Sequence, residues 1–261
     1  MYDLHCHAGF SADPAALGML IEASDLQVLS ATVTPDEFTR ISAQLADAPS
    51  VHIAAGLHPW WIPDDELAAD KATEQLLAAL ERTRFVGEIG LDFSPSHVHS
   101  KQAQLHSCAR ILAACADKGG KVLTIHSVRA TNALLDLLEE TRCTANCACI
   151  MHWFSGTSDE LHRAIELGCF FSVGEHMLAT KRGRAYVRAI PEGRLLLETD
   201  LPEKHDTDIP HDRDAADEAQ REFDELTTSL ETALAGVLAL GSHHTESSIE
   251  TASRELLDRK A

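Results

Sequence analysis

Histidines and carboxylates recur in this sequence at the ends of short apolar runs. His5 and His7 stand two residues apart at the end of the first run, so both imidazoles face the same side of a strand. The same pattern recurs on four later runs, which end at or near Glu88, His126, His152 and Asp200. Buried groups of these types are costly unless they are paired or bind a metal. Their recurrence on five predicted strands favours a divalent-metal centre over the alternative, a set of separate hydrogen-bonded core residues.

The number of candidate ligands indicates how many ions the centre holds. Six ligands exceed the four of one tetrahedral ion and suit two ions that share a bridging carboxylate. Two ions roughly 3.5–4 Å apart activate a water and stabilise both the attacking and the leaving oxygen. Mixed histidine and carboxylate ligation fits zinc or manganese, and carboxylate-rich sites also admit magnesium. The predicted chemistry is therefore hydrolysis with two divalent ions, Zn, Mn or Mg.

The apolar runs predict the strands that position these ligands. Eight runs have the continuous apolar character of buried parallel strands: Tyr2–His5, Gln27–Thr32, Val51–Leu57, Phe85–Leu91, Lys121–His126, Ala148–His152, Cys169–Val173 and Leu195–Thr199. Amphipathic stretches between them predict helices over Asp13–Ala23, Pro35–Asp47, Glu66–Arg82, Lys101–Lys118, Ala130–Thr141, Ser158–Leu167 and Thr180–Ile190. Eight βα units predict an α/β fold, a (β/α)8 TIM barrel that forms a single domain over residues 1–261.

The alternative architecture is a doubly wound open sheet. Its dinucleotide-binding form lacks support, because no Gly-x-Gly-x-x-Gly follows the first predicted strand. In a barrel, the ligand residues meet at the carboxyl ends of the strands, where barrel enzymes place their chemistry. The last part of the chain is predicted to supply closing helices over about 212–260, namely Ala215–Leu240 and Thr245–Lys260. The turn-rich stretch Pro202–His211 is predicted to be a loop over the barrel mouth.

Composition narrows the classes of protein. Hydrophobic residues make up 44% of the 261 residues, which indicates a globular chain, and no apolar run reaches the roughly 18–20 residues that span a bilayer. The amino terminus lacks a secretory signal, so the expected location is the cytoplasm. Seven cysteines are an odd number, and the spacing of Cys143, Cys147 and Cys149 favours packing or turn positions over a second metal site.

The net charge of −19 disfavours tight binding to long duplexes. It does not exclude nucleic acid as a substrate, because bound cations reverse the charge locally.

Six ordered motifs resemble those of the TatD-like metal-dependent hydrolases, a branch of the amidohydrolase superfamily. They are Asp3-Leu4-His5-Cys6-His7, Gly56-Leu57-His58-Pro59, Val86-Gly87-Glu88-Ile89-Gly90-Leu91-Asp92, Ile125-His126-Ser127, His152-Trp153-Phe154-Ser155-Gly156 and Glu198-Thr199-Asp200-Leu201-Pro202. The resemblance implies a TIM barrel and a DNase or phosphodiesterase that acts on DNA ends or single strands.

The resemblance also implies a role for each ligand. His5, His7 and Asp200 would hold one ion, His126 and His152 would hold the other, and Glu88 would bridge the two; these assignments follow from the matching motifs. Asp200 would also be the general base for the attacking water, so Asp200 and Glu88 are the expected catalytic carboxylates.

Finer features resemble the TatD-like component of Qat anti-phage defence systems. They are the stretch from Val28 to Pro35, Trp153 after His152, and the stretch from Cys169 to Gly174. This resemblance implies partner proteins in a defence complex. Two features depart from the family pattern: Leu201 follows Asp200, and Ala252-Ser253-Arg254-Glu255-Leu256-Leu257 replaces the usual carboxyl-terminal ending.

The substrate contacts are predicted from position alone. His58 follows the third predicted strand and is expected to hydrogen-bond a substrate phosphate, with an ordinary loop role as the alternative. Arg129 has the planar fork that holds phosphate oxygens, and a helix-surface salt bridge is its alternative. Glu198 shares a strand face with Asp200 and is expected to orient a ligand. Two other functions remain open: hydrolysis of a small amide, ester or lactone, and a non-catalytic subunit of a defence complex.

Overall fold

The computed structural model describes residues 1–203 and 215–258. Within these residues, eight strands form the centre of the molecule: β1 (Tyr2–Cys6), β2 (Gln27–Ala31), β3 (Val51–Ala54), β4 (Phe85–Asp92), β5 (Val122–Val128), β6 (Ala148–His152), β7 (Phe170–Val173) and β8 (Leu195–Leu197). The helices that follow them are α1 (Pro14–Glu22), α2 (Pro35–Gln44), α3 (Glu66–Ala79), α4 (Lys101–Lys118), α5 (Thr131–Thr141), α6 (Cys143–Asn146), α7 (Ser158–Glu166), α8 (Glu175–Ala179), α9 (Lys181–Ala189), α10 (Ala215–Ala239) and α11 (Glu246–Asp258). Three short 3-10 helices are η1 (Ala8–Phe10), η2 (Pro59–Trp61) and η3 (Val98–Ser100).

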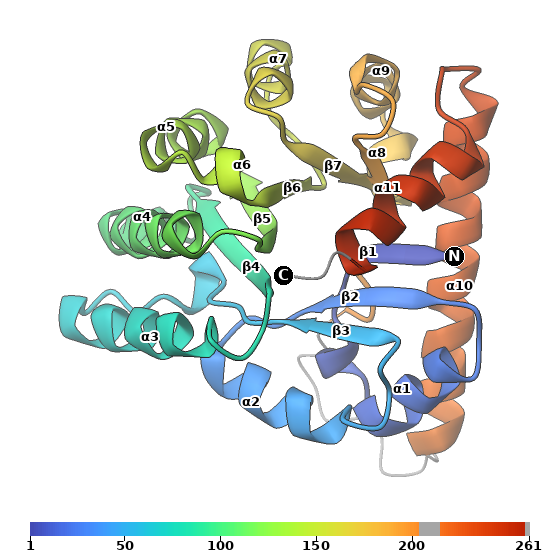
Figure 1. Cartoon of the computed structure of the whole chain (residues 1–261), viewed down its shortest axis with the longest axis horizontal. Helices are drawn as coiled ribbons and strands as arrows, with labels where there is room; N and C mark the ends of the chain where they lie inside the picture. Colours follow the sequence, from blue (N-terminus) through green and yellow to red (C-terminus); the bar gives the residue numbers. More distant parts are fainter. Residues whose placement is uncertain (204–214, 259–261) are drawn as a thin grey trace.

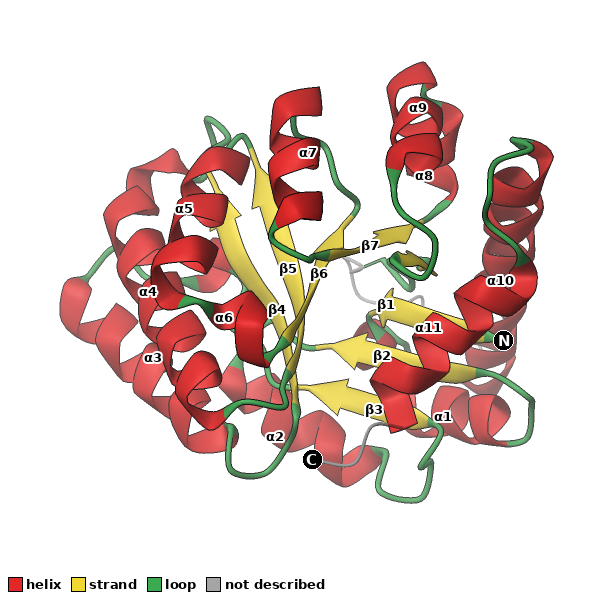
Figure 2. Ribbon diagram, turned by 45° about the horizontal axis from the view of Figure 1, so that its top comes forward, coloured by secondary structure: helices red, strands yellow, loops and turns green. Residues whose placement is uncertain are grey.

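The strands are parallel and follow their order in the chain. β1, β2 and β3 form one sheet, and β4 to β8 form a second. An isolated bridge between Ala55 and Val86 links the two sheets on one side, and on the other the Asp200 N–H donates to the His5 carbonyl at 3.0 Å. Figure 2 shows the strands arranged around a common centre with helices outside them. The predicted (β/α)8 fold is confirmed.

Local sequence signals begin the helices where they were predicted. Thr34 caps α2, since its side chain accepts a hydrogen bond from the Glu37 N–H, and Pro35 takes the first helical position. Thr157 and Glu160 form a reciprocal capping box at the start of α7. These caps set the residue at which each helix begins, and so they set the length of the loop that joins it to the preceding strand.

Three buried hydrophobic clusters are present among the described residues, and the two larger ones account for most of the packing. The larger lies between strands and helices and includes Cys6, which packs with residues of the helix layer such as Leu17. The smaller joins strand residues such as Leu4 and Leu196 to Leu256 of α11, and Figure 1 shows α11 lying across one end of the ring of strands. Cys143 and Cys149 are buried with their sulfurs 3.9 Å apart, which agrees with the predicted packing role.

The differences from the predictions concern boundaries and short elements. α6 and α8 were not predicted, because helices of four and five residues are too short to show a helical period. β3 ends at Ala54, where Gly56 passes so close to Thr32 that a Cβ on this glycine would lie 1.6 Å from the Thr32 oxygen. α10 and α11 match the predicted closing helices within residues 215–258, whereas most of the predicted loop Pro202–His211 and the two ends of the predicted span 212–260 lie outside the described residues. None of the described helices has the length and apolar character that crossing a membrane requires.

Candidate metal centre

The six predicted ligands meet at the carboxyl ends of the strands. They come from β1, β4, β5 and β6 and from the segments just after β1 and β8: His5, His7, Glu88, His126, His152 and Asp200. Their ligand atoms fall into overlapping groups, including one of His5, His7 and Asp200 and one of His5, Glu88 and His152, within which all atoms lie within 4.8 Å of one another. The folded chain therefore brings together residues that lie up to 195 positions apart (200 − 5).

Glu88 lies at the centre of this group, and its two oxygens face different histidines. Oε2 is 3.5 Å from Nε2 of His7 and 3.6 Å from Nε2 of His5. Oε1 is 2.8 Å from Nδ1 of His126 and 3.6 Å from Nε2 of His152. Burial alone would raise the pKa of Glu88, but the surrounding imidazoles hold it well below its usual range. The carboxylate is thus ionised and shared between two sets of nitrogen ligands.

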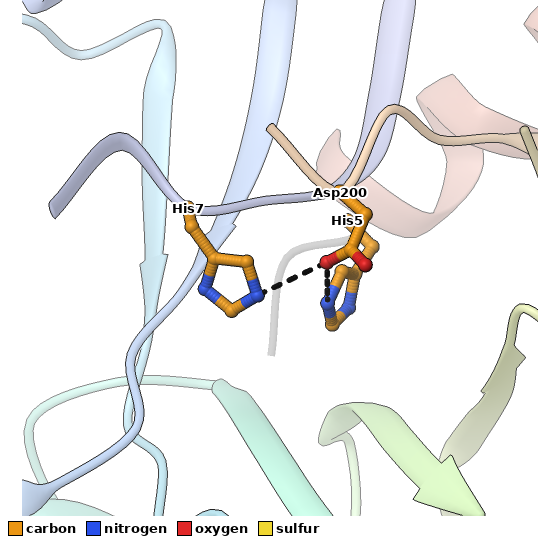
Figure 3. A group of neighbouring side chains, drawn as sticks. All are labelled: His5, His7 and Asp200. Atoms are coloured by element: carbon orange, nitrogen blue, oxygen red, sulfur yellow. Dashed lines mark ion pairs between the residues drawn. The ribbon is translucent and has the colours of Figure 1, made fainter. Parts of the chain in front are cut away.

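Asp200 completes the first of these sets. Its Oδ1 lies 3.2 Å from Nε2 of His7 and 3.5 Å from Nε2 of His5 (Figure 3). Burial would raise the pKa of Asp200, yet the nearby histidines lower it strongly. The side chain remains 28% exposed, because it faces the cavity at the barrel mouth. An ionised carboxylate that touches both ligands and cavity is suited to bind a cation and to accept a proton.

The outer nitrogens of His5 and His7 contact residues of two other strands, β5 and β2. Nδ1 of His7 lies 3.3 Å from the carbonyl oxygen of Ala31, and Nδ1 of His5 lies 2.5 Å from the hydroxyl of Thr124. Both rings therefore direct Nε2 toward the carboxylates, as metal-binding histidines do. Nε2 of His5 is buried and makes no hydrogen bond within the described chain. A buried nitrogen without such a partner fits a cation in its place.

Glu198 positions His152. Its Oε2 lies 3.0 Å from Nδ1 of His152 and also accepts a hydrogen bond from the hydroxyl of Ser172. Its Oε1 accepts the backbone N–H of Trp153 at 3.0 Å. This carboxylate is buried, so it fixes both the ring and the main chain at the end of β6. The orienting role predicted for Glu198 therefore has a specific contact, with His152.

His126 faces Glu88 with Nδ1, whereas the other ligand histidines face it with Nε2. Nδ1 faces Glu88, while Nε2 lies 3.2 Å from Oδ2 of Asp92. Asp92 also accepts hydrogen bonds from the indole N–H of Trp60 at 2.6 Å and from the backbone N–H of Ser94 at 2.7 Å. Burial lowers the pKa of His126, but Asp92 and Glu88 outweigh it and raise the pKa to about 9. Asp92 both faces the lumen and caps the following turn.

His58 lies inside the cluster and lines the cavity above it. Its Nε2 is 3.4 Å from Oε1 of Glu88 and 3.3 Å from Nδ1 of His126. Its Nδ1 accepts the backbone N–H of Trp60 at 3.2 Å, and burial lowers the pKa of His58 to about 4. A neutral imidazole that accepts at one nitrogen donates at the other. His58 is therefore placed as a hydrogen-bond donor, although its position alone would also allow metal ligation.

A cavity of about 840 Å³ opens over the cluster. Besides the site residues, four aromatic side chains line it, Phe10, Trp60, Trp61 and Trp153, together with two valines, two serines, Pro202 and the acidic Glu203. Among the described residues that line it there is no lysine or arginine. Arg129 lies exposed just after β5 with a φ of 54° and is not part of the described wall. The structure thus brings seven of the eight predicted site residues into one cluster and leaves Arg129 outside the described cavity wall.

Sequence reasoning missed two buried partners of the cluster. Asp3 accepts hydrogen bonds from the backbone N–H groups of His5 at 3.1 Å and Thr199 at 3.2 Å, and from the Thr199 hydroxyl at 2.6 Å. It therefore fastens the end of β1 to the segment that carries Asp200. Thr124 is the second missed partner. Asp3 and Thr124 each stand two residues before a ligand histidine, and residues two apart on a strand face the same side. This spacing could have predicted that both face the site.

Comparisons with known proteins show which family the chain resembles. The family model described as TatD related DNase matches residues 2–237. An uncharacterized metal-dependent hydrolase of Escherichia coli, YjjV, is 29% identical over 77% of this chain and 79% of its own length. The 3'-5' ssDNA/RNA exonuclease TatD of Musicola paradisiaca is 31% identical over 66% of this chain and 65% of its own. The crystal structure of the Escherichia coli YjjV protein superimposes with a TM-score of 0.69 at 24% identity, over 98% of this chain and 97% of that one. Since the family model covers most of its length, the chain belongs to the family of TatD-related DNases.

Proposed function

We propose that this chain is a divalent-metal-dependent phosphodiesterase that hydrolyses DNA with a binuclear metal centre. The observation that carries the proposal is the position of Glu88, whose two oxygens face two separate sets of histidines. A carboxylate shared in this way is the usual bridge between two ions. Family membership supports the same reaction class.

The ligands divide between the two ions. His5, His7 and Asp200 would hold the first, His126 and His152 would hold the second, and Glu88 would contribute one oxygen to each. Three features fit cations at these places: ionised carboxylates, histidines fixed from behind, and the buried Nε2 of His5. Zinc, manganese and magnesium all suit such a donor set.

The protein groups supply the proton transfer and the orientation. When bound, the two cations supply Lewis-acid activation of a water and stabilise negative charge on the phosphate oxygens. Asp200 accepts a proton from the attacking water as the new phosphorus–oxygen bond forms and the bond to the leaving oxygen breaks. The leaving oxygen then takes up a proton. His58 donates its Nε2–H to a phosphate oxygen, which holds the phosphorus in line.

Nucleic acid is the substrate best supported by the surroundings. The Musicola relative is named as an exonuclease of single-stranded DNA and RNA. α9 follows the carboxyl end of β7 through α8, and it begins with the exposed cations Lys181 and Arg182. Both side chains are exposed, and we infer that they meet phosphates of the bound strand outside the cavity. Arg129, exposed at the end of β5, is proposed to do the same.

One observation favours a second candidate. The described cavity wall has no lysine or arginine to pair with phosphates, and a small uncharged ester or lactone would need no such partner. The same centre can activate water against a carbonyl carbon. This alternative predicts hydrolysis of small esters and none of oligonucleotides, so a substrate panel separates it from the nuclease.

The test measures release of acid-soluble nucleotides from end-labelled single- and double-stranded DNA, with manganese, magnesium or zinc. Metal-dependent release by the wild type and none by the His126→Ala/Asp200→Asn double variant is expected, because that variant loses a ligand of each ion and the proton acceptor. His162→Gln is the control, since His162 is exposed on α7 and pairs only with Glu166 in the described structure. Release by the double variant, or none by a metal-loaded wild type, would overturn the nuclease.

Glu198→Gln is expected to weaken metal binding by about 10- to 100-fold, as removal of an outer partner of a ligand histidine does. The change leaves all six ligands in place but removes the charge that holds Nδ1 of His152. Competition with a fluorescent chelator measures the affinity, and Glu140→Gln on the exposed side of α5 is the matched control. Equal affinities for the two variants would contradict the positioning role of Glu198.

A further inference from the structure

We propose that Trp153 is a base-stacking residue that makes this site specific for unpaired nucleotides. The inference rests on the proposed nuclease function and adds to it a residue that selects the substrate. Trp153 follows His152 directly, lines the cavity and is 39% exposed. Its ring centroid lies 6.4 Å from that of His152. A base on this indole would therefore sit beside the proposed metal centre.

The backbone holds Trp153 in this position at a conformational cost. Its φ is 38°, a left-handed value that bulky residues rarely adopt. In this conformation the backbone N–H of Trp153 donates a hydrogen bond to Oε1 of the buried Glu198. The same carboxylate positions His152, so the ring and the metal ligand are fixed by one group. A strained backbone conformation that surrounding contacts hold in place is typical of a functional position.

The indole is also braced from one side. His176 of α8 stacks on it with centroids 4.9 Å apart and planes 10° from parallel. His176 covers part of the indole, and the rest of the side chain is exposed where it lines the cavity. Stacking on an aromatic face needs a base whose own face is free. Bases inside a duplex are already stacked and paired, so the arrangement favours single strands and frayed ends.

Trp60 is less suited to the same role. It is 50% exposed, but His97 stacks on it at 4.8 Å and its N–H is bound to Asp92. A change at Trp60 would disturb Asp92 and, through it, His126. Among the described residues, Trp153 hydrogen-bonds the site through its main chain alone, so its side chain can be changed while the ligands stay in place.

The test compares wild type, Trp153→Leu and Trp153→Phe on a ten-residue thymidine oligonucleotide and on an abasic strand of equal length. Trp153→Leu is expected to raise KM for the thymidine strand about 5- to 50-fold with little change in kcat. Trp153→Phe keeps a ring and is expected to stay within about 3-fold of wild type. On the abasic strand all three proteins are expected to behave alike, because no base is there to stack.

Binding is measured independently of turnover, by fluorescence anisotropy of labelled strands in an Asp200→Asn background. The same rise in Kd is expected there for Trp153→Leu. Leu67→Ala is the control, since Leu67 is 79% exposed on α3 and is not among the described residues that line the cavity. If wild type cleaves the thymidine strand and Trp153→Leu matches its KM and Kd, the stacking role is wrong and the nuclease stands. If wild type neither cleaves nor binds any strand, the proposed function itself fails and the stacking role falls with it.

Discussion

Asp200→Asn is expected to lower kcat for DNA hydrolysis by about 100- to 10,000-fold, the range that loss of a general base produces. The amide keeps the size of the side chain but cannot accept a proton from water. It also removes a negative charge that lies 3.2 Å from His7 and 3.5 Å from His5. Initial rates on labelled single-stranded DNA at saturating metal measure the effect.

The metal dependence of this variant separates the two roles of Asp200. If Asp200 were only a ligand, excess metal would restore turnover, whereas a lost proton acceptor leaves kcat low at any metal concentration. Asp117→Asn, exposed on α4, is the matched control and is expected to leave kcat unchanged. Recovery of wild-type kcat at high metal would contradict the general-base role.

The strand-end histidines and carboxylates could be predicted because they follow apolar runs, and these runs recur along the sequence in alternation with amphipathic helical stretches. Apolar runs mark buried strands, and parallel strands end on the same side of a barrel. Residues as distant as His5 and Asp200 could therefore be placed in one centre before any contact was known. Helix starts were also predictable at Thr34, because a cap followed by proline and acids is a local signal.

The contacts behind the ligands could not be predicted in the same way. Thr124 touches His5 and Glu198 touches His152 across strands, so each pairing depends on register and side-chain direction. The conformation of Trp153 depends on a hydrogen bond to Glu198, which no local pattern encodes. The mouth of the cavity is the least predictable part, since loops rather than strand periods shape it.

The resemblance to the Qat defence component stays a prediction. Trp153 was one of the features that carried it, and the structure gives this residue a place in the cavity wall. A residue beside the site bears on substrate choice. It carries no information about partner proteins, which would meet the chain on another surface or not at all.

Glu88→Gln is expected to reduce bound metal from two ions per chain to one or none. The amide is neutral, whereas the two proposed ions would share the negative charge of Glu88. Its Oε2 faces His7 and its Oε1 faces His126. Metal content after dialysis measures the stoichiometry, and Glu140→Gln, exposed on α5, is expected to keep two ions. Two ions in Glu88→Gln would rule out the bridge.

Thermal unfolding gives a second readout that needs no substrate. A ligand at about 100 times its Kd stabilises the native state by about 2.7 kcal/mol, which for a chain of this size raises Tm by roughly 5–10 °C. The wild type is expected to show that rise on adding metal after chelation, and Glu88→Gln is expected to show little of it. Because Glu88 is proposed to contribute to both sites, its loss should remove most of the metal-dependent stabilisation at once. Loss of His7, which is proposed to bind one ion, should leave part of it. An equal and complete loss in Glu88→Gln and His7→Ala would instead indicate a single ion held by the whole cluster.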